Sequence, residues 1–199
     1  MTPSDLYDKL VCKYSTLVVD SICQVETTCR KRGFCAEKQS HQVIDFDEVK
    51  NVFYQGKGTP ASVDAVCLGD KKQYFCFVEL KGWNNYIAHI DKQKDDVKNT
   101  AAGYNLRGKL EDSEELCEKI IGDANLFDSM PIVFLLVTDI EVKNDGMEAF
   151  ADAMFKLAET STDITSRCVN AAEDILKEQI RIEHDYIYCK EFDSHLAKL

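Results

Sequence analysis

The chain has 199 residues, 45% of them hydrophobic, so it is long enough to bury the core of one domain. It contains no Gly/Ser linker, internal repeat or apolar run of membrane-spanning length, which argues against a repeat array and a membrane protein. The N-terminal residues carry acids and lack the apolar segment of a signal peptide, so we expect a cytoplasmic protein. We predict a single domain over residues 1–199, on which an acidic helical C-terminal part, about 146–182, is packed.

The net charge of −11 is distributed unevenly. Residues 1–110 have a balance of +2, whereas residues 111–199 have a balance of −13. Phosphate binding draws on basic surface, so the overall charge disfavours a nucleic-acid protein, but its distribution does not. We expect the first half to admit a nucleic acid, while the second half faces solvent or a basic protein partner.

The nine cysteines predict reduced core thiols more readily than disulfides or a metal. Their number is odd, and they form no CxxC or Cys/His pair with zinc spacing. Cys23, Cys29 and Cys35 recur every six residues, which leaves a cysteine cluster open as the alternative.

A helix is expected first along the chain. Ser4-Asp5 after Pro3 provides a plausible N-terminal cap, and apolar residues recur every three or four positions from Leu6 to Val25. Basic residues and Gly33 follow, where such a helix ends. The pattern predicts one long core helix or two shorter ones.

The next segment, residues 41–54, reads as one or two short strands that lead into a loop at 56–60. Glu48 within it is a further acid that either approaches a site or remains an ordinary loop charge.

Two alternating runs, 62–68 and 74–81, flank the turn-forming Gly69-Asp70-Lys71-Lys72 and predict a β-hairpin. A turn about Lys71-Lys72 places Asp64 opposite Glu79, because antiparallel partners have a constant index sum. The same register pairs Val66 with Phe77 and Leu68 with Phe75, all on one face. Lys81 joins that face two residues after Glu79.

Three ionisable groups thus converge at the open end of an apolar hairpin. Asp64 and Glu79 repel each other, and a divalent cation that prefers oxygen ligands, Mg²⁺ or Mn²⁺, relieves that repulsion. Lys81 can then orient a water or stabilise charge on a phosphate. The alternative is an ordinary solvated Glu79–Lys81 pair at a strand end. Against it stand the apolar neighbours from Phe75 to Leu80, typical of a strand buried on both faces.

After the hairpin, Trp83 and Tyr86 either stack on a base or cap the core. The polar stretch 91–98 continues as a helix toward Ile120, and residues 130–138 form a buried strand parallel to the Glu79 strand. One helix follows Gly146, another runs from about 164 to 180, and 186–189 reads as an edge strand. This order predicts an α/β fold, a mixed central β-sheet flanked by helices.

The Asp64…Glu79-Leu80-Lys81 arrangement resembles the PD-(D/E)xK nucleases, the restriction-endonuclease-like phosphodiesterases. The resemblance covers about twenty residues directly and agrees with the order of elements elsewhere. One departure is visible, since the proline that precedes the aspartate in the family is Val63 here.

The resemblance implies that Asp64, Glu79 and the main-chain carbonyl of Leu80 bind the Mg²⁺ or Mn²⁺ ion, and that Lys81 positions the attacking water. In that fold the first helix often supplies one more acid, for which Asp20 is preferred here over Glu26; either is otherwise a solvated charge. The helix after the motif lends polar side chains to the substrate. The residues whose spacing fits that role, or a merely solvated face, are Lys92, Gln93, Lys94 and Lys98.

We therefore predict a metal-dependent nuclease, a hydrolase of phosphodiester bonds in nucleic acid, with DNA favoured over RNA. The alternative is a catalytically silent scaffold of the same fold that binds a protein partner through its acidic C-terminal half.

Overall fold

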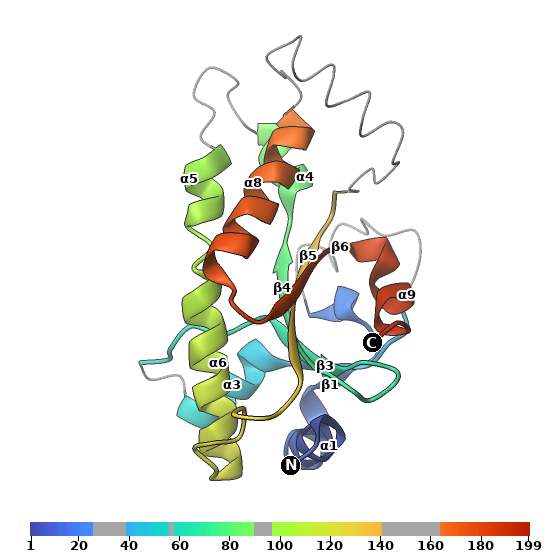
Figure 1. Cartoon of the computed structure of the whole chain (residues 1–199), viewed down its shortest axis with the longest axis vertical. Coiled ribbons are helices and arrows are strands. Elements are labelled where there is room, and N and C mark those ends of the chain that lie inside the picture. Colours follow the sequence, from blue (N-terminus) through green and yellow to red (C-terminus); the bar gives the residue numbers. More distant parts are fainter. Residues whose placement is uncertain (26–38, 56–57, 90–96, 141–163) are drawn as a thin grey trace.

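The computed structural model describes residues 1–25, 39–55, 58–89, 97–140 and 164–199. Within these ranges, six strands form one sheet in the order β1-β2-β3-β4-β5-β6, and helices flank it (Figure 1). The strands are β1 Val18–Val19, β2 Val43–Asp45, β3 Ala65–Leu68, β4 Phe75–Lys81, β5 Ile132–Thr138 and β6 Glu183–Tyr188. The helices are α1 Pro3–Lys13, α3 Phe46–Tyr54, α4 Trp83–His89, α5 Val97–Ala102, α6 Leu106–Ile121, α8 Ile164–Gln179 and α9 Phe192–Leu196.

The predicted hairpin and its register are confirmed. β3 pairs with β4 antiparallel, Val66 opposite Phe77 and Leu68 opposite Phe75. The turn closes through the Lys72 amide, which donates to the Gly69 carbonyl at 2.8 Å. Because this register has no bulge, every residue of the predicted face points to the same side of the sheet.

β5 is the parallel neighbour of β4, as its position after a helical crossover predicts. β6 adds in parallel to β5 and ends the sheet, so the predicted edge strand is also confirmed, although it begins at Glu183. With antiparallel pairs from β1 to β4 and parallel pairs from β4 to β6, the sheet is mixed, and the fold is α/β.

Each face of the sheet has its own core. On one face α1, α3, α5, α6 and α8 pack over alternate residues of β2 to β5, among them Phe75, Phe77 and Phe134. On the other face α9 packs over the intervening residues, such as Val78 and Leu135. Both faces of the central strands are therefore apolar, and a charged group on them requires compensation.

Of the two alternatives for the N-terminal segment, one long helix is wrong, because α1 ends at Lys13. The end expected near Gly33 lies outside the described residues. Tyr14 leaves the helical conformation, a 3₁₀ turn follows, and the β-branched pair Val18–Val19 joins the sheet beside β2. The apolar spacing beyond residue 14 thus reflects side chains that reach the core from turns and a strand rather than from one helical face.

Residues 46–54 form helix α3 rather than a second strand. The Asp45 side chain accepts a hydrogen bond from the Glu48 amide at 3.1 Å and caps the helix, and Gln55 ends it in the left-handed conformation. The short apolar run at 52–54 resembles a strand by composition, but the cap decides the local structure.

The helix predicted from the polar stretch to Ile120 is interrupted. α5 ends at Ala102, and Asn105, with a φ of 51°, begins α6 after a turn at Gly103. α8 confirms the helix expected over 164–180, whereas α9 was not predicted. The helix expected after Gly146, and with it much of the acidic part at 146–182, lies outside the described residues.

The seven described cysteines carry no disulfide. Four of them are buried as the composition suggests: Cys67, Cys76, Cys117 and Cys168. Two members of the alternative cysteine cluster, Cys29 and Cys35, lie outside the described residues. Among the residues that the structure describes, no helix is long and apolar enough to span a bilayer.

Candidate functional site

Asp64, Glu79 and Lys81 meet where the hairpin opens. The Lys81 Nζ atom lies 2.5 Å from Glu79 Oε1. Asp64, which directly precedes β3, accepts a hydrogen bond from the Leu80 amide at 2.6 Å through Oδ2, so its carboxylate is held at the strand that carries the other two. The structure therefore brings together the three side chains that the sequence singled out.

Lys109 is a fourth charged member that sequence reasoning missed. It projects from α6, and its Nζ atom lies 2.6 Å from the same Glu79 Oε1 atom. Leu106 and Leu110 on either side of it are buried. A lysine beside the apolar stripe of a helix was the available signal, but only packing of α6 on the sheet shows which group it meets.

Glu79 is the electrostatic centre of this cluster. It has no exposed surface, and burial, assisted by the nearby Asp64 charge, raises its pKa to about 7 although Lys81 and Lys109 oppose the shift. Burial also raises the pKa of Asp64, against the attraction of Lys109 and Lys81 and the hydrogen bond from Leu80.

For Lys109, burial acts against the charged form, but Glu79, Asp64 and Asp47 together outweigh it and raise its pKa. The cluster therefore holds acids that resist ionisation beside a lysine that retains its proton.

One oxygen of Glu79 has no partner. Both lysines contact Oε1, whereas Oε2 is buried without a hydrogen bond. A buried acceptor without a donor is costly, and a cation bound at Oε2 would satisfy it. The two carboxylates and the Leu80 carbonyl are hard oxygen donors of the kind Mg²⁺ and Mn²⁺ prefer, so the donor set fits such an ion.

The side chains of the described residues do not by themselves form a complete metal cage. In the part of the chain that the structure describes, no group of three His, Cys, Asp or Glu side chains could hold a metal ion. A cation at Asp64 and Glu79 would thus need the main-chain carbonyl and water for its remaining positions, as Mg²⁺ commonly does.

Asp47, in the first turn of α3, borders the cluster. Its carboxylate accepts a hydrogen bond from Lys50 at 2.7 Å and another from the Ser62 hydroxyl, two residues before Asp64. It lies close enough to affect the pKa values of Asp64 and Lys109. The strand assignment for 46–54 concealed this residue, since helix α3 is what turns it toward the hairpin.

Asp20 does not join the site, so the prediction of a helix acid at this position is wrong. It follows β1 rather than lying on a helix, and it accepts a hydrogen bond from the Gln42 side chain at 3.3 Å. The adjacent His41 contacts the Leu68 carbonyl, near the turn of the hairpin and away from its open end.

Two other predicted residues, Glu48 and Lys98, are described by the structure. Glu48 lies in the first turn of α3, and Lys98 is exposed on α5. Outside the described residues lie Glu26, Lys92, Gln93 and Lys94.

Aromatic side chains line the site beside Lys81. Its ammonium lies 5.0 Å from the centre of the Tyr104 ring, a cation–π contact. Trp83 packs against Tyr104 and Tyr86 with ring centres 5.6 and 5.3 Å away. Trp83 is buried, so it caps the core rather than presenting a free face for base stacking.

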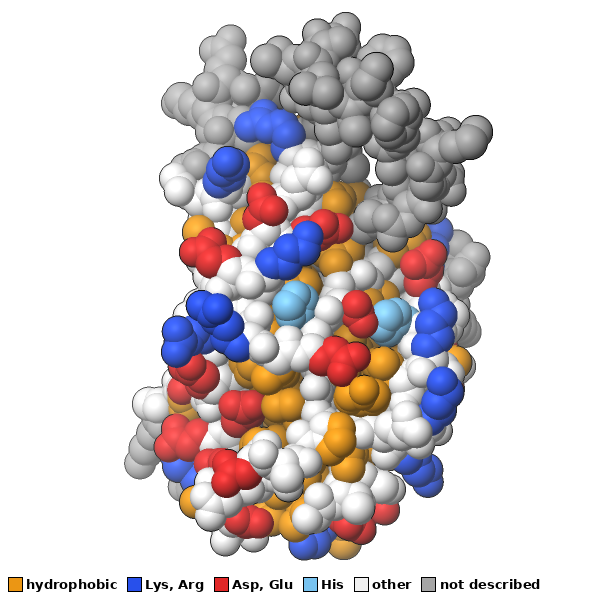
Figure 2. Space-filling view, in the orientation of Figure 1, with side chains coloured by type: hydrophobic (Ala, Val, Ile, Leu, Met, Phe, Trp, Pro, Cys, Tyr) orange, Lys and Arg blue, Asp and Glu red, His pale blue; other side chains and the backbone are white. Residues whose placement is uncertain are grey.

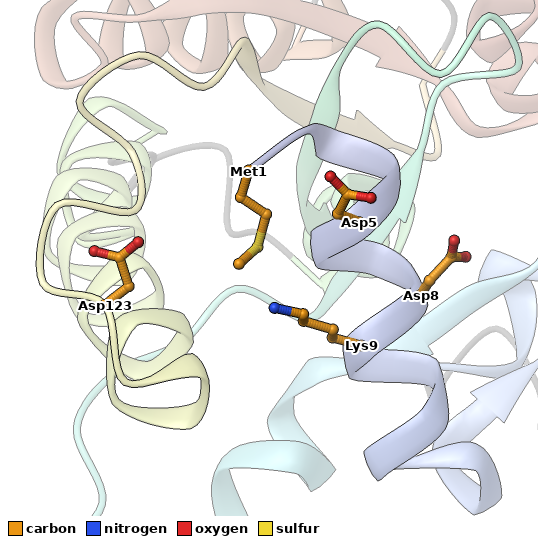
Figure 3. Close-up of a pocket in the computed structure, with 5 residues that line it drawn as sticks. All are labelled: Met1, Asp5, Asp8, Lys9 and Asp123. Carbon is orange, nitrogen blue, oxygen red and sulfur yellow. The ribbon is translucent and has the colours of Figure 1, made fainter.

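The surface hollow in Figure 3 lies away from this chemistry. It is lined by Met1, Asp5, Asp8, Lys9 and Asp123, between α1 and the segment just after α6. Asp5 is already engaged in the capping box of α1 with Thr2. Since α6 spans roughly 24 Å, the hollow and Lys109 lie toward opposite ends of that helix.

Comparisons of the chain with protein-family models, with curated proteins and with solved structures gave no match.

Proposed function

We propose that this protein is a restriction-endonuclease-like phosphodiesterase that hydrolyses nucleic acid with Mg²⁺ or Mn²⁺. The observation that carries the proposal is the buried Glu79 carboxylate, which shares one oxygen between two lysines and leaves the other without a partner. Asp64 is near enough to help raise the pKa of Glu79. An ordinary surface ion pair would not be placed on an apolar sheet face, where desolvation opposes its charge.

Each residue of the cluster has a role that follows from its chemistry. Asp64, Glu79 and the Leu80 carbonyl would hold the cation, which lowers the pKa of a bound water and neutralises phosphate charge. Lys81 is close enough to Glu79 to donate a hydrogen bond to a water at the same place and orient it toward phosphorus. The Tyr104 ring beneath its ammonium restricts the directions in which Lys81 can point.

The face of the molecule in Figure 2 suits a local rather than an extended contact with nucleic acid. On this face, basic and acidic side chains are interspersed, and no continuous basic stripe crosses its described part. A nucleic acid that approaches this face should bind through the site and its cation more than through a broad electrostatic footprint, and assays need low salt so that this weak attraction is not screened.

A silent scaffold is the second candidate, and one observation favours it. Glu79 already has two lysine partners, so the cluster could serve only to anchor α6 on the sheet. On that hypothesis the acidic half of the chain binds a basic protein partner, and the charged cluster contributes structure alone.

A cleavage assay separates the two functions. Wild-type protein is compared with Lys81→Met on single- and double-stranded DNA and RNA, with Mg²⁺ or Mn²⁺ at low salt. Methionine retains the apolar stem over Tyr104 and removes the amine, so we expect turnover to fall roughly 100-fold or more. Lys119→Met, which removes a surface lysine paired with Glu115, is the matched control and should retain activity. Wild-type protein that cleaves no substrate under any of these conditions would reject the hydrolase.

A further inference from the structure

Lys109 is surrounded by negative charge. Its ammonium contacts Glu79 of β4 directly. It is also attracted by Asp64, which precedes β3, and by Asp47 of α3. Its side chain is only 21% exposed. Lys109 and Lys81 thus compensate these acids together when no ion is bound.

A divalent ion on Glu79 opposes the two lysines that already contact this carboxylate. Lys81 and Lys109 contact the same Oε1 atom, at 2.5 and 2.6 Å, whereas Oε2 is free to take the ion. An ion bound there would repel both ammonium groups and neutralise the negative charge that holds them. Binding therefore favours the departure of at least one lysine.

Of the two lysines, Lys109 is the one whose contacts a divalent ion would weaken more. Lys81 lies two residues from Glu79 on the same strand and has a second attraction, the Tyr104 ring, that a cation would not remove. The three groups that attract Lys109 are all carboxylates, and a divalent ion would weaken each attraction by neutralising them.

From this arrangement, and resting on the proposed function, we infer that Lys109 pairs with Glu79 when no ion is bound and becomes a substrate-binding residue when an ion binds. When Mg²⁺ or Mn²⁺ binds, the Lys109 ammonium leaves Glu79 and pairs with a non-bridging oxygen of the substrate phosphate. Substrate binding and metal binding are thereby coupled, because only the metal releases the lysine.

The first test compares Mn²⁺ affinity by titration calorimetry in wild-type protein, Lys109→Met and the control Lys119→Met. Removal of an ammonium group that repels the ion should tighten binding roughly tenfold or more in Lys109→Met. The control should match the wild type. Equal Mn²⁺ affinity in Lys109→Met and wild-type protein overturns the exchange, and so does a wild type and a variant that both fail to bind Mn²⁺.

The second test uses wild-type protein and so does not depend on the folding of a variant. An amine-acetylating reagent is applied with and without Mn²⁺ and with a phosphorothioate oligonucleotide, and each lysine is quantified by peptide mass spectrometry. We expect Mn²⁺ to increase labelling of Lys109 relative to Lys81, and the oligonucleotide to protect it again. A larger Mn²⁺-induced increase at Lys81 overturns the proposal.

These measurements fail separately from the proposed function. A protein that shows the exchange but cleaves no nucleic acid rejects the hydrolase and retains Lys109 as an anion-binding group. A protein that cleaves nucleic acid while Lys109→Met has wild-type Mn²⁺ affinity retains the hydrolase and rejects the exchange.

Discussion

Replacement of Glu79 by glutamine should remove a large part of the pH dependence of stability. In the folded, metal-free protein the pKa of Glu79 is raised from 4.5 to about 7, chiefly by burial. An acid with a higher pKa in the folded state binds its proton more tightly there. Between pH 4.5 and about pH 7 the folded state holds more protons than the unfolded state, so the free energy of unfolding falls as pH rises.

The raised pKa sets the size of the effect. The difference between 4.5 and about 7 corresponds to about 3 kcal/mol, fully developed once the pH exceeds the folded pKa. Asp64 lies beside Glu79, so the measured transition belongs to the pair. Glutamine retains the shape and an oxygen for the lysines but cannot ionise, so the variant should lack this loss.

The measurement is urea unfolding in EDTA from about pH 5 to about pH 8. The quantity of interest is the difference in unfolding free energy between Glu79→Gln and wild type, because other titrating groups largely cancel in it. We expect this difference to rise in favour of the variant as pH increases. Glu114→Gln is the matched control, since burial and two glutamates raise the pKa of Glu114 to about 7 on α6. It should also flatten the wild-type pH dependence in EDTA, but when the unfolding is repeated with Mn²⁺ in place of EDTA, Glu114→Gln should gain as much stability from the ion as wild type does. A pH-independent difference for Glu79→Gln would refute the reasoning.

Three further outcomes are expected. In Asp64→Asn the amide oxygen can still accept the hydrogen bond from Leu80, so without metal the variant should melt at a higher temperature than wild type near pH 8. Mn²⁺ should raise its melting temperature less than that of wild type, and an equal rise in both proteins would show that Asp64 does not bind the ion. Asp139→Ala deprives the first amides of α4 of their acceptor, at 2.6 Å for the shortest bond, and should lower the unfolding free energy by about 1–2 kcal/mol in urea, whereas Asp139→Asn should recover part of it. Gly69→Ala would place its Cβ 2.8 Å from the backbone of Leu199 and should lower the unfolding free energy by about 1–3 kcal/mol. A variant as stable as wild type in urea would contradict this prediction.

The hairpin could be predicted in detail because its determinants are local. Alternation defines the two strands, the residues at 69–72 define the turn, and an antiparallel pair then has one index sum. That sum alone placed Asp64 beside Glu79, and the two-residue period placed Lys81 on the same face. The parallel pairing of β4 with β5 was equally accessible, since a long crossover between two buried strands leaves few alternatives.

The length of α1 and the helix at 46–54 were not accessible in this way. Apolar spacing from Leu6 to Val25 suits a helix, but residues beyond Tyr14 reach the core from turns and from β1. The run ending at Tyr54 suits a strand, but the Asp45 cap and packing on the sheet favour a helix. Short patterns of this kind are compatible with more than one structure, and tertiary contacts choose between them.

The sequence by itself therefore determined the part of the site that lies on one hairpin: Asp64, Glu79 and Lys81. The tertiary structure decided which charges surround that hairpin. Lys109 and Asp47 come from helices, and whether they meet Glu79 and Asp64 depends on how α6 and α3 pack against the sheet. Packing also excluded Asp20, because β1 carries it toward the other end of the hairpin. Strand pairing follows from periods of two residues, whereas the position of a helix on a sheet follows from the fit of whole apolar faces, which no local pattern specifies.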